Sequence, residues 1–177
     1  HEIMADPPLA RYLRQFHDLE ATPSLPPVAG IDVTEYKRVV AERFANPEVR
    51  DQVARVCMDG TAKLPKFLIP TVESQLERGG QVKLSALALA AWCQYLLGTD
   101  DRGEAITLSS DPRLEEARAY AVASVSDPAA FLGFREVFGE RLAVDPRFVS
   151  AFSEALVSLR EAGTYGTLAT WLDGGTS

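Results

Sequence analysis

Aspartate followed directly by proline recurs along this chain, and no other feature restricts its fold as strongly. The pairs are Asp6-Pro7, Asp111-Pro112, Asp127-Pro128 and Asp145-Pro146, with Asn46-Pro47 as a close relative. The first side chain can accept hydrogen bonds from free N–H groups at the start of a helix, and proline fits the first turn because its missing N–H is not needed there. Five such helix starts predict an all-α fold.

Apolar residues at helical spacing predict a mainly helical bundle. The segment 83–97 is apolar on nearly every side, so we expect it at the centre. The predicted helices are 6–20, 33–45, 47–59, 65–78, 83–97, 111–124, 127–140 and 146–162, with a short one at 166–172. Glycine readily adopts the left-handed conformation that follows many helices. Helix ends are therefore predicted at Gly60, Gly79, Gly80, Gly98 and Gly163.

One stretch departs from the helical pattern. GTDDRGEAITLSSDP, residues 98–112, contains a tight turn at Asp101-Arg102-Gly103 between short extended arms. This predicts a small hairpin near 99–110. The length of 177 residues suits a single domain over 1–177.

The charge of the chain argues against two kinds of partner. Lys and Arg number 18 against 25 Asp and Glu, which gives a formal net charge of −7. A negative surface repels phosphate backbones and anionic lipid headgroups, so neither nucleic acid nor a membrane is expected as a partner. The longest apolar run, LSALALAAWCQYLL, is shorter than the ~20 residues of a membrane span.

The two cysteines, Cys57 and Cys93, lie in apolar helical patterns and are interpreted as small core residues. There is no CxxC spacing and no nearby His, so neither a disulfide nor a metal site is favoured. Few cysteines and the lack of a signal-peptide layout favour a cytoplasmic protein.

The stretch ARVCMDGTAKLPKFLIP, residues 54–70, is the main candidate for a binding site. If helix 47–59 continues for one distorted turn past Gly60, then Arg55, Asp59 and Lys63 share one edge of it. Such a row is either a ladder of surface ion pairs or a set of charged donors for a hydroxyl-rich ligand. Spacing alone favours the ladder.

Other polar and aromatic residues have simpler interpretations. His17 is interpreted as a surface or capping residue, Asn46 as a helix cap, and Trp92 and Tyr95 as core. The residues taken by themselves contain no catalytic constellation, no GxGxxG and no HExxH.

The stretch from Tyr36 to Pro70 resembles the C-terminal domain of the mannitol dehydrogenase family of polyol-specific long-chain dehydrogenases. The resemblance extends over about residues 2 to 163. The matching motifs are RFANP (43–47), DGTAKLPK (59–66), ALALAAWCQYLLGTDDRGEAITLSSDP (86–112) and FREVFGERLAVDPRF (134–148).

The resemblance implies a two-domain enzyme that needs no metal. In that family an N-terminal Rossmann domain binds NAD or NADP, and the helical C-terminal domain closes the substrate cleft. The general base is a lysine in the pattern K-x-x-x-x-N-x-x-H, which is absent here. We therefore expect this chain to start after that pattern, to lack the cofactor domain, to bind no cofactor itself and to be inactive alone.

The resemblance also implies site residues and a substrate class. Arg55 and Lys63 match the family's substrate-binding Arg and Lys, so both are predicted to bind the substrate, with Asp59 as their structural partner. The Gly60 break would aim Lys63 inward. The expected activity is oxidation of a secondary alcohol of mannitol, or of a similar sugar alcohol, to the ketose. The alternatives are a fructuronate or tagaturonate reductase, which acts on a sugar acid, and a non-catalytic helical interaction module.

Overall fold

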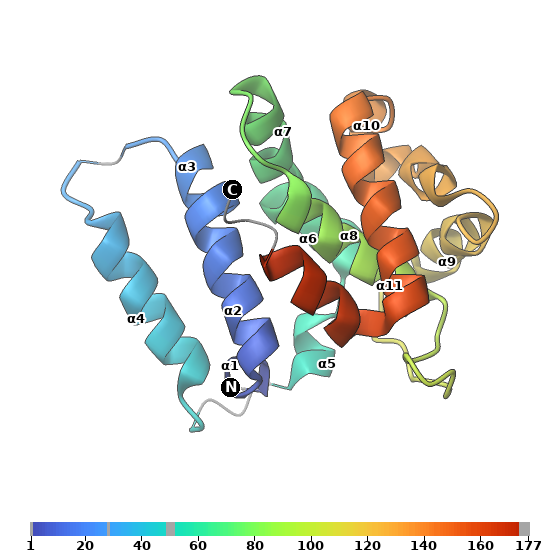
Figure 1. Cartoon of the computed structure of the whole chain (residues 1–177), viewed down its shortest axis with the longest axis horizontal. Coiled ribbons are helices and arrows are strands. Elements are labelled where there is room, and N and C mark those ends of the chain that lie inside the picture. Colours follow the sequence, from blue (N-terminus) through green and yellow to red (C-terminus); the bar gives the residue numbers. More distant parts are fainter. Residues whose placement is uncertain (1, 28, 49–51, 174–177) are drawn as a thin grey trace.

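The computed structural model describes residues 2–27, 29–48 and 52–173, and helices dominate this part of the chain (Figure 1). They are α1 (Glu2–Ala5), α2 (Pro7–Phe16), the π-helical turn η1 (His17–Ala21), α3 (Thr22–Ser24), α4 (Val33–Ala45), α5 (Val53–Val56), α6 (Gly60–Phe67), α7 (Ile69–Glu77), α8 (Lys83–Leu96), α9 (Leu114–Ala123), the 3-10 helix η2 (Pro128–Gly133), α10 (Arg135–Leu142) and α11 (Pro146–Asp173). The all-α prediction is confirmed.

The core forms around α8, as its apolar sequence predicts. This helix packs mainly against α11. Phe131, Phe138, Phe148 and Phe152 are all fully or almost fully buried, and their rings contact one another at the centre of the cluster. The long C-terminal helix bends at Gly163, where φ is +68°, so the predicted segments 146–162 and 166–172 are the two arms of one bent helix.

A buried carboxylate joins η1 to the start of α8. Glu20 is 0% exposed, and its Oε1 accepts a hydrogen bond from the N–H of Leu84 at 2.6 Å. Its Oε2 accepts from the N–H of Ser85 at 2.7 Å and from the Ser85 hydroxyl at 2.5 Å. Burial raises the pKa of Glu20, and these three hydrogen bonds oppose the rise. Glu20 therefore caps the central helix from a distant part of the chain.

All five predicted helix caps accept hydrogen bonds from N–H groups that follow them, and four of the five precede a helix. Asp6, Asp127 and Asp145 cap the helices that follow them, and Asp111 accepts from the N–H of Arg113 at 2.9 Å. Asn46 accepts from the N–H of Glu48, but only a turn follows it.

The predicted helix 47–59 and its cap at Gly60 are wrong. In the described part of this region α5 spans one turn, and α6 begins at Gly60. The residue with positive φ is Asp59, at +58°, whereas Gly79 and Gly98 do adopt the predicted positive φ.

The predicted hairpin near 99–110 reduces to a single antiparallel bridge between Thr99 and Ala105 in the described residues. The turn is closed by the N–H of Asp100, which donates to the carbonyl of Glu104 at 2.9 Å. Cys93 is buried as expected, but Cys57 is exposed, so its prediction as a core residue is wrong.

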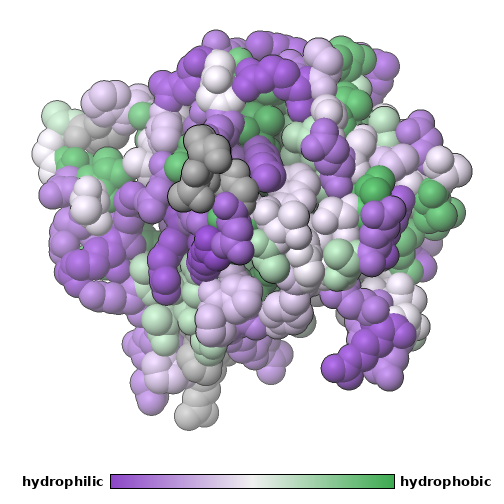
Figure 2. Space-filling model, in the orientation of Figure 1, coloured by the Kyte–Doolittle hydropathy of each residue, from purple (hydrophilic) through white to green (hydrophobic). Residues whose placement is uncertain are grey.

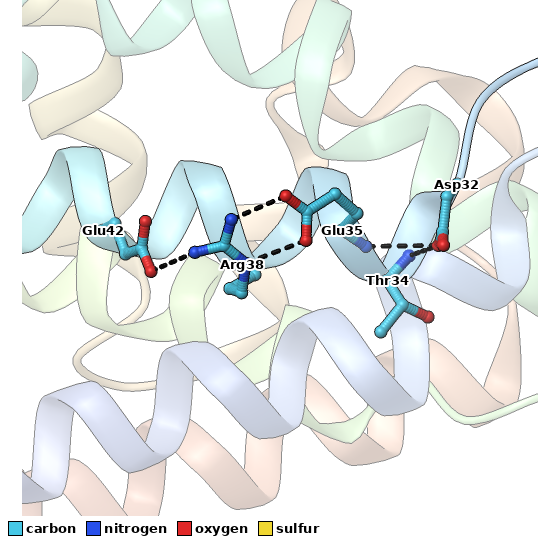
Figure 3. A network of polar contacts seen from close by, with 5 residues as sticks. All are labelled: Asp32, Thr34, Glu35, Arg38 and Glu42. Carbon is cyan, nitrogen blue, oxygen red and sulfur yellow. Dashed lines mark hydrogen bonds and ion pairs between the residues drawn. The ribbon is translucent and has the colours of Figure 1, made fainter.

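Helix α4 lies at the edge of the molecule, and none of its residues is buried (Figure 1). Asp32 caps it, and Arg38 forms ion pairs with Glu35 and Glu42 along its surface (Figure 3). The face seen in Figure 2 is largely hydrophilic, with hydrophobic side chains in small groups. Within the described residues, no helix combines the length and apolarity needed to cross a membrane.

Candidate functional site

The predicted site residues lie on either side of a break between two helices. Arg55 belongs to α5 and is exposed, and Lys63 belongs to the first turn of α6 and is partly exposed. The Lys63 ammonium donates a hydrogen bond to the backbone carbonyl oxygen of Val56 at 3.3 Å. Its side chain thus reaches back across the break to the residue that follows Arg55.

Asp59 makes the break through its backbone. Its left-handed conformation is one that Asp tolerates better than most residues. Its N–H donates to the carbonyl of Ser110 at 3.0 Å, and its carbonyl accepts from the N–H groups of Ala62 and Lys63. No ion pair joins Asp59 to Lys63 among the described residues. The predicted ladder is therefore wrong for this pair, because the helix that would align the charges is interrupted.

Gly60 is required for a close approach to the core. A Cβ atom at this position would lie 2.9 Å from Nε1 and 3.3 Å from Cε2 of Trp92. Trp92 packs against the core and meets the ring of Phe131 edge-on, with 5.3 Å between centroids. The first turn of α6 therefore rests directly on the indole of α8.

Three consecutive residues of the 98–112 loop contact the segment that carries Arg55 and Lys63. The Ser109 hydroxyl donates to the carbonyl of Ala54 at 2.7 Å, and the Ser110 carbonyl accepts from Asp59. The Asp111 carboxylate accepts from the N–H of Thr61 at 2.8 Å and from the Thr61 hydroxyl at 2.5 Å. Sequence analysis missed these contacts, because an Asp-Pro pair signals only the cap of its own helix.

The positive charge of Lys63 also affects the nearby thiol of Cys57. Desolvation raises the pKa of the Cys57 thiol, and the positive charge of Lys63 partly offsets that rise. Two cationic side chains on an accessible surface can donate hydrogen bonds to hydroxyl groups or to a carboxylate. The described residues contain no group of three or more His, Cys, Asp or Glu arranged to hold a metal ion.

A polar cavity of about 490 Å³ lies at a different place, between α8, the 100–101 turn and the bend of α11. Neither Arg55 nor Lys63 lines it. Arg160, on its wall, donates to the carbonyl oxygen of Ser124 at 2.7 Å and to its hydroxyl at 2.8 Å.

Residues 1–160 match the family model described as the mannitol dehydrogenase C-terminal domain. The chain is 36% identical over 171 residues to mannitol 2-dehydrogenase of Phaeosphaeria nodorum, covering 97% of this chain and 29% of that protein. It is 32% identical over 173 residues to mannitol 2-dehydrogenase of Aspergillus niger, covering 98% of this chain and 35% of that protein.

Solved structures share the fold as well. The structure of Pseudomonas fluorescens mannitol 2-dehydrogenase in a ternary complex with NAD and D-mannitol matches with a TM-score of 0.91 and 39% identity, over 98% of this chain and 35% of that one. A substrate-free D-sorbitol dehydrogenase matches in fold, with a TM-score of 0.81 and 24% identity, over 92% of this chain and 33% of that one. The chain thus spans about a third of the length of these relatives. It belongs to the mannitol dehydrogenase family and corresponds to the C-terminal domain of that family.

Proposed function

We propose that this chain is the substrate-binding domain of an NAD-dependent polyol dehydrogenase that oxidises a secondary alcohol of mannitol, or of a similar sugar alcohol, to the ketose. The observation that carries the proposal is the placement of Arg55 and Lys63 at one helix break. The fold around this break matches that of an enzyme whose structure holds NAD and D-mannitol.

Arg55 and Lys63 orient the substrate by donating hydrogen bonds to hydroxyl groups remote from the reacting carbon. Hydrogen bonds from charged donors contribute roughly 1.5–3 kcal/mol each, which suits a ligand made almost wholly of hydroxyl groups. Lys63 already hydrogen-bonds a neutral carbonyl oxygen, that of Val56, and a substrate hydroxyl can replace it.

The chain has no glycine-rich nucleotide-binding fingerprint, so its own residues do not fit NAD. We propose that a Rossmann domain elsewhere in the full-length protein would hold NAD, which would supply the hydride acceptor, and that a lysine outside this chain would remove the hydroxyl proton. The part of this chain is to bind and orient the sugar alcohol.

A substrate panel on the full-length enzyme tests the proposal. We expect NAD⁺-dependent oxidation of mannitol, arabinitol or sorbitol, and none by this chain alone. A pair of cations also suits a carboxylate, so fructuronate and tagaturonate belong in the panel. Reduction of either sugar acid without oxidation of any polyol would replace the polyol assignment with a hexuronate reductase. Oxidation of mannitol by the isolated chain would contradict the division of labour between two domains.

A further inference from the structure

We propose that Asp111 is a positioning residue that aims Lys63 at the substrate. This inference rests on the proposed function, because it concerns how Lys63 is held in the substrate-binding site.

The Asp111 carboxylate accepts hydrogen bonds at the starts of two helices. Its Oδ1 accepts from the N–H of Arg113 at 2.9 Å, at the start of α9. The same carboxylate accepts from both the N–H and the hydroxyl of Thr61, the second residue of α6, although fifty residues separate the two positions. A carboxylate at a helix N-terminus is favoured by the exposed N–H groups and by the helix dipole.

Helix α6 depends on this distant cap because it lacks a local one. Asp59 precedes the helix, but its left-handed backbone leaves its side chain without a capping hydrogen bond. The Asp59 carbonyl accepts hydrogen bonds from the N–H groups of Ala62 and Lys63. The N–H of Thr61 donates to the Asp111 carboxylate instead. Thr61 is 9% exposed, so water is a poor substitute partner for its N–H.

Fixing Thr61 fixes the direction of Lys63, which lies two residues later in the same turn. A Cβ atom added at Gly60 would lie 2.9 Å from Nε1 of Trp92 and 3.6 Å from Oδ2 of Asp111. The first turn of α6 thus lies against both an indole ring and a carboxylate. Rotation of the turn about its axis would break both contacts, and Lys63 turns with it.

The neighbouring residues of the loop extend this support to Arg55. The Ser109 hydroxyl donates a hydrogen bond to the carbonyl of Ala54. The backbone N–H of Ser109 donates to the hydroxyl oxygen of Tyr95, on the central helix α8, at 2.6 Å. The loop therefore connects both cationic positions to the rigid core of the domain.

The test is a double-mutant cycle in the full-length enzyme with mannitol as the substrate. Asp111→Asn, Thr61→Val and Lys63→Ala are made singly, and each of the first two is combined with Lys63→Ala. Asp127→Asn is the matched control, since Asp127 also precedes a proline and caps only its own helix. Thr61→Ser keeps the hydroxyl and should retain wild-type kinetics.

We expect Asp111→Asn and Thr61→Val each to lower kcat/KM at least about tenfold, mainly through KM, and Asp127→Asn to leave it unchanged. In the Lys63→Ala background the same changes should have no further effect, because they act through Lys63. If Asp111→Asn does not fold, the kinetics of Thr61→Val with and without Lys63→Ala test the inference.

Equal losses in the two backgrounds, or a lower Tm with unchanged kinetics, would overturn the inference and leave the proposed function standing. If Lys63→Ala itself leaves the mannitol kinetics unchanged, the substrate role of Lys63 fails first, and the inference falls with it.

Discussion

The ammonium nitrogen of Lys63 lies 3.3 Å from the backbone carbonyl oxygen of Val56, across the break between α5 and α6. A row of charges along one continuous helix would have directed Lys63 toward Asp59. The break instead turns the side chain back toward α5, which carries Arg55. The two predicted site residues therefore share one small region of the surface.

Removing either cation should weaken substrate recognition. In the full-length enzyme, Arg55→Ala and Lys63→Ala are each expected to lower kcat/KM for mannitol at least about tenfold, equivalent to ~1.4 kcal/mol of lost transition-state stabilisation. Lys66→Ala is the control, since Lys66 is an exposed lysine of the same helix. Steady-state kinetics at saturating NAD⁺ provide the measurement. Wild-type values for both variants would remove Arg55 and Lys63 from the site.

Adding a methyl group at Gly60 should destabilise the protein. A Cβ atom there would lie 2.9 Å from Nε1 of Trp92, which packs against the core, so the indole or the helix must move. We expect Gly60→Ala to cost about 1–3 kcal/mol of unfolding free energy, measured by denaturant titration of the full-length enzyme.

Gly133→Ala is the matched control for that experiment. A Cβ at Gly133 meets its nearest neighbour, Tyr120, at 3.5 Å, an ordinary contact distance. If both alanine variants are equally stable, the contact between α6 and Trp92 is not as close as described.

The buried carboxylate of Glu20 should make stability depend on pH. Burial raises its pKa above the ordinary value of 4.5. The folded state then binds the proton more tightly than the unfolded state, so this contribution to stability is fully present below pH ~4.5 and is lost as the pH rises through the folded-state pKa.

Glu20→Gln should remove this decrease in stability with rising pH. Denaturant titrations at a series of pH values from pH 4 upwards measure the effect. The Gln amide also presents N–H groups to the N–H donors of Leu84 and Ser85, so we expect the variant to lose about 1–3 kcal/mol of unfolding free energy. Glu115→Gln, on an exposed side chain, is the control. An unchanged pH profile in the Glu20 variant would assign the pH dependence to another group.

The two thiols should differ sharply in reactivity. Cys57 is exposed, whereas Cys93 is buried, and burial raises the pKa of its thiol to about 11. A thiol reagent at pH 8, followed by peptide mass mapping, should label Cys57 first. Lys63→Ala should slow that labelling, because the ammonium lowers the pKa of the Cys57 thiol. Faster labelling of Cys93 than of Cys57 would contradict the burial pattern.

Much of the fold is predictable because its signals are local. Asp127 and Asp145 cap the helices that begin beside them, and the apolar segment 83–97 can be stable only in a core. The site is less predictable because its geometry depends on tertiary contacts. Gly60 looks like a helix end, but its function is to let α6 approach Trp92. Nothing near Asp111 in sequence shows that it also caps Thr61.

Helix α4 lies outside the packed part of the domain. None of its residues is buried, and Tyr36 and Phe44 are 62% and 52% exposed. Its ion pairs are screened by solvent and contribute little to stability. This helix should therefore open and close independently of the bundle, and amide hydrogen exchange should detect it as a separate cooperative unit that exchanges before α8. The domain then combines a rigid part, which holds the site, with a peripheral helix that opens at a lower free energy.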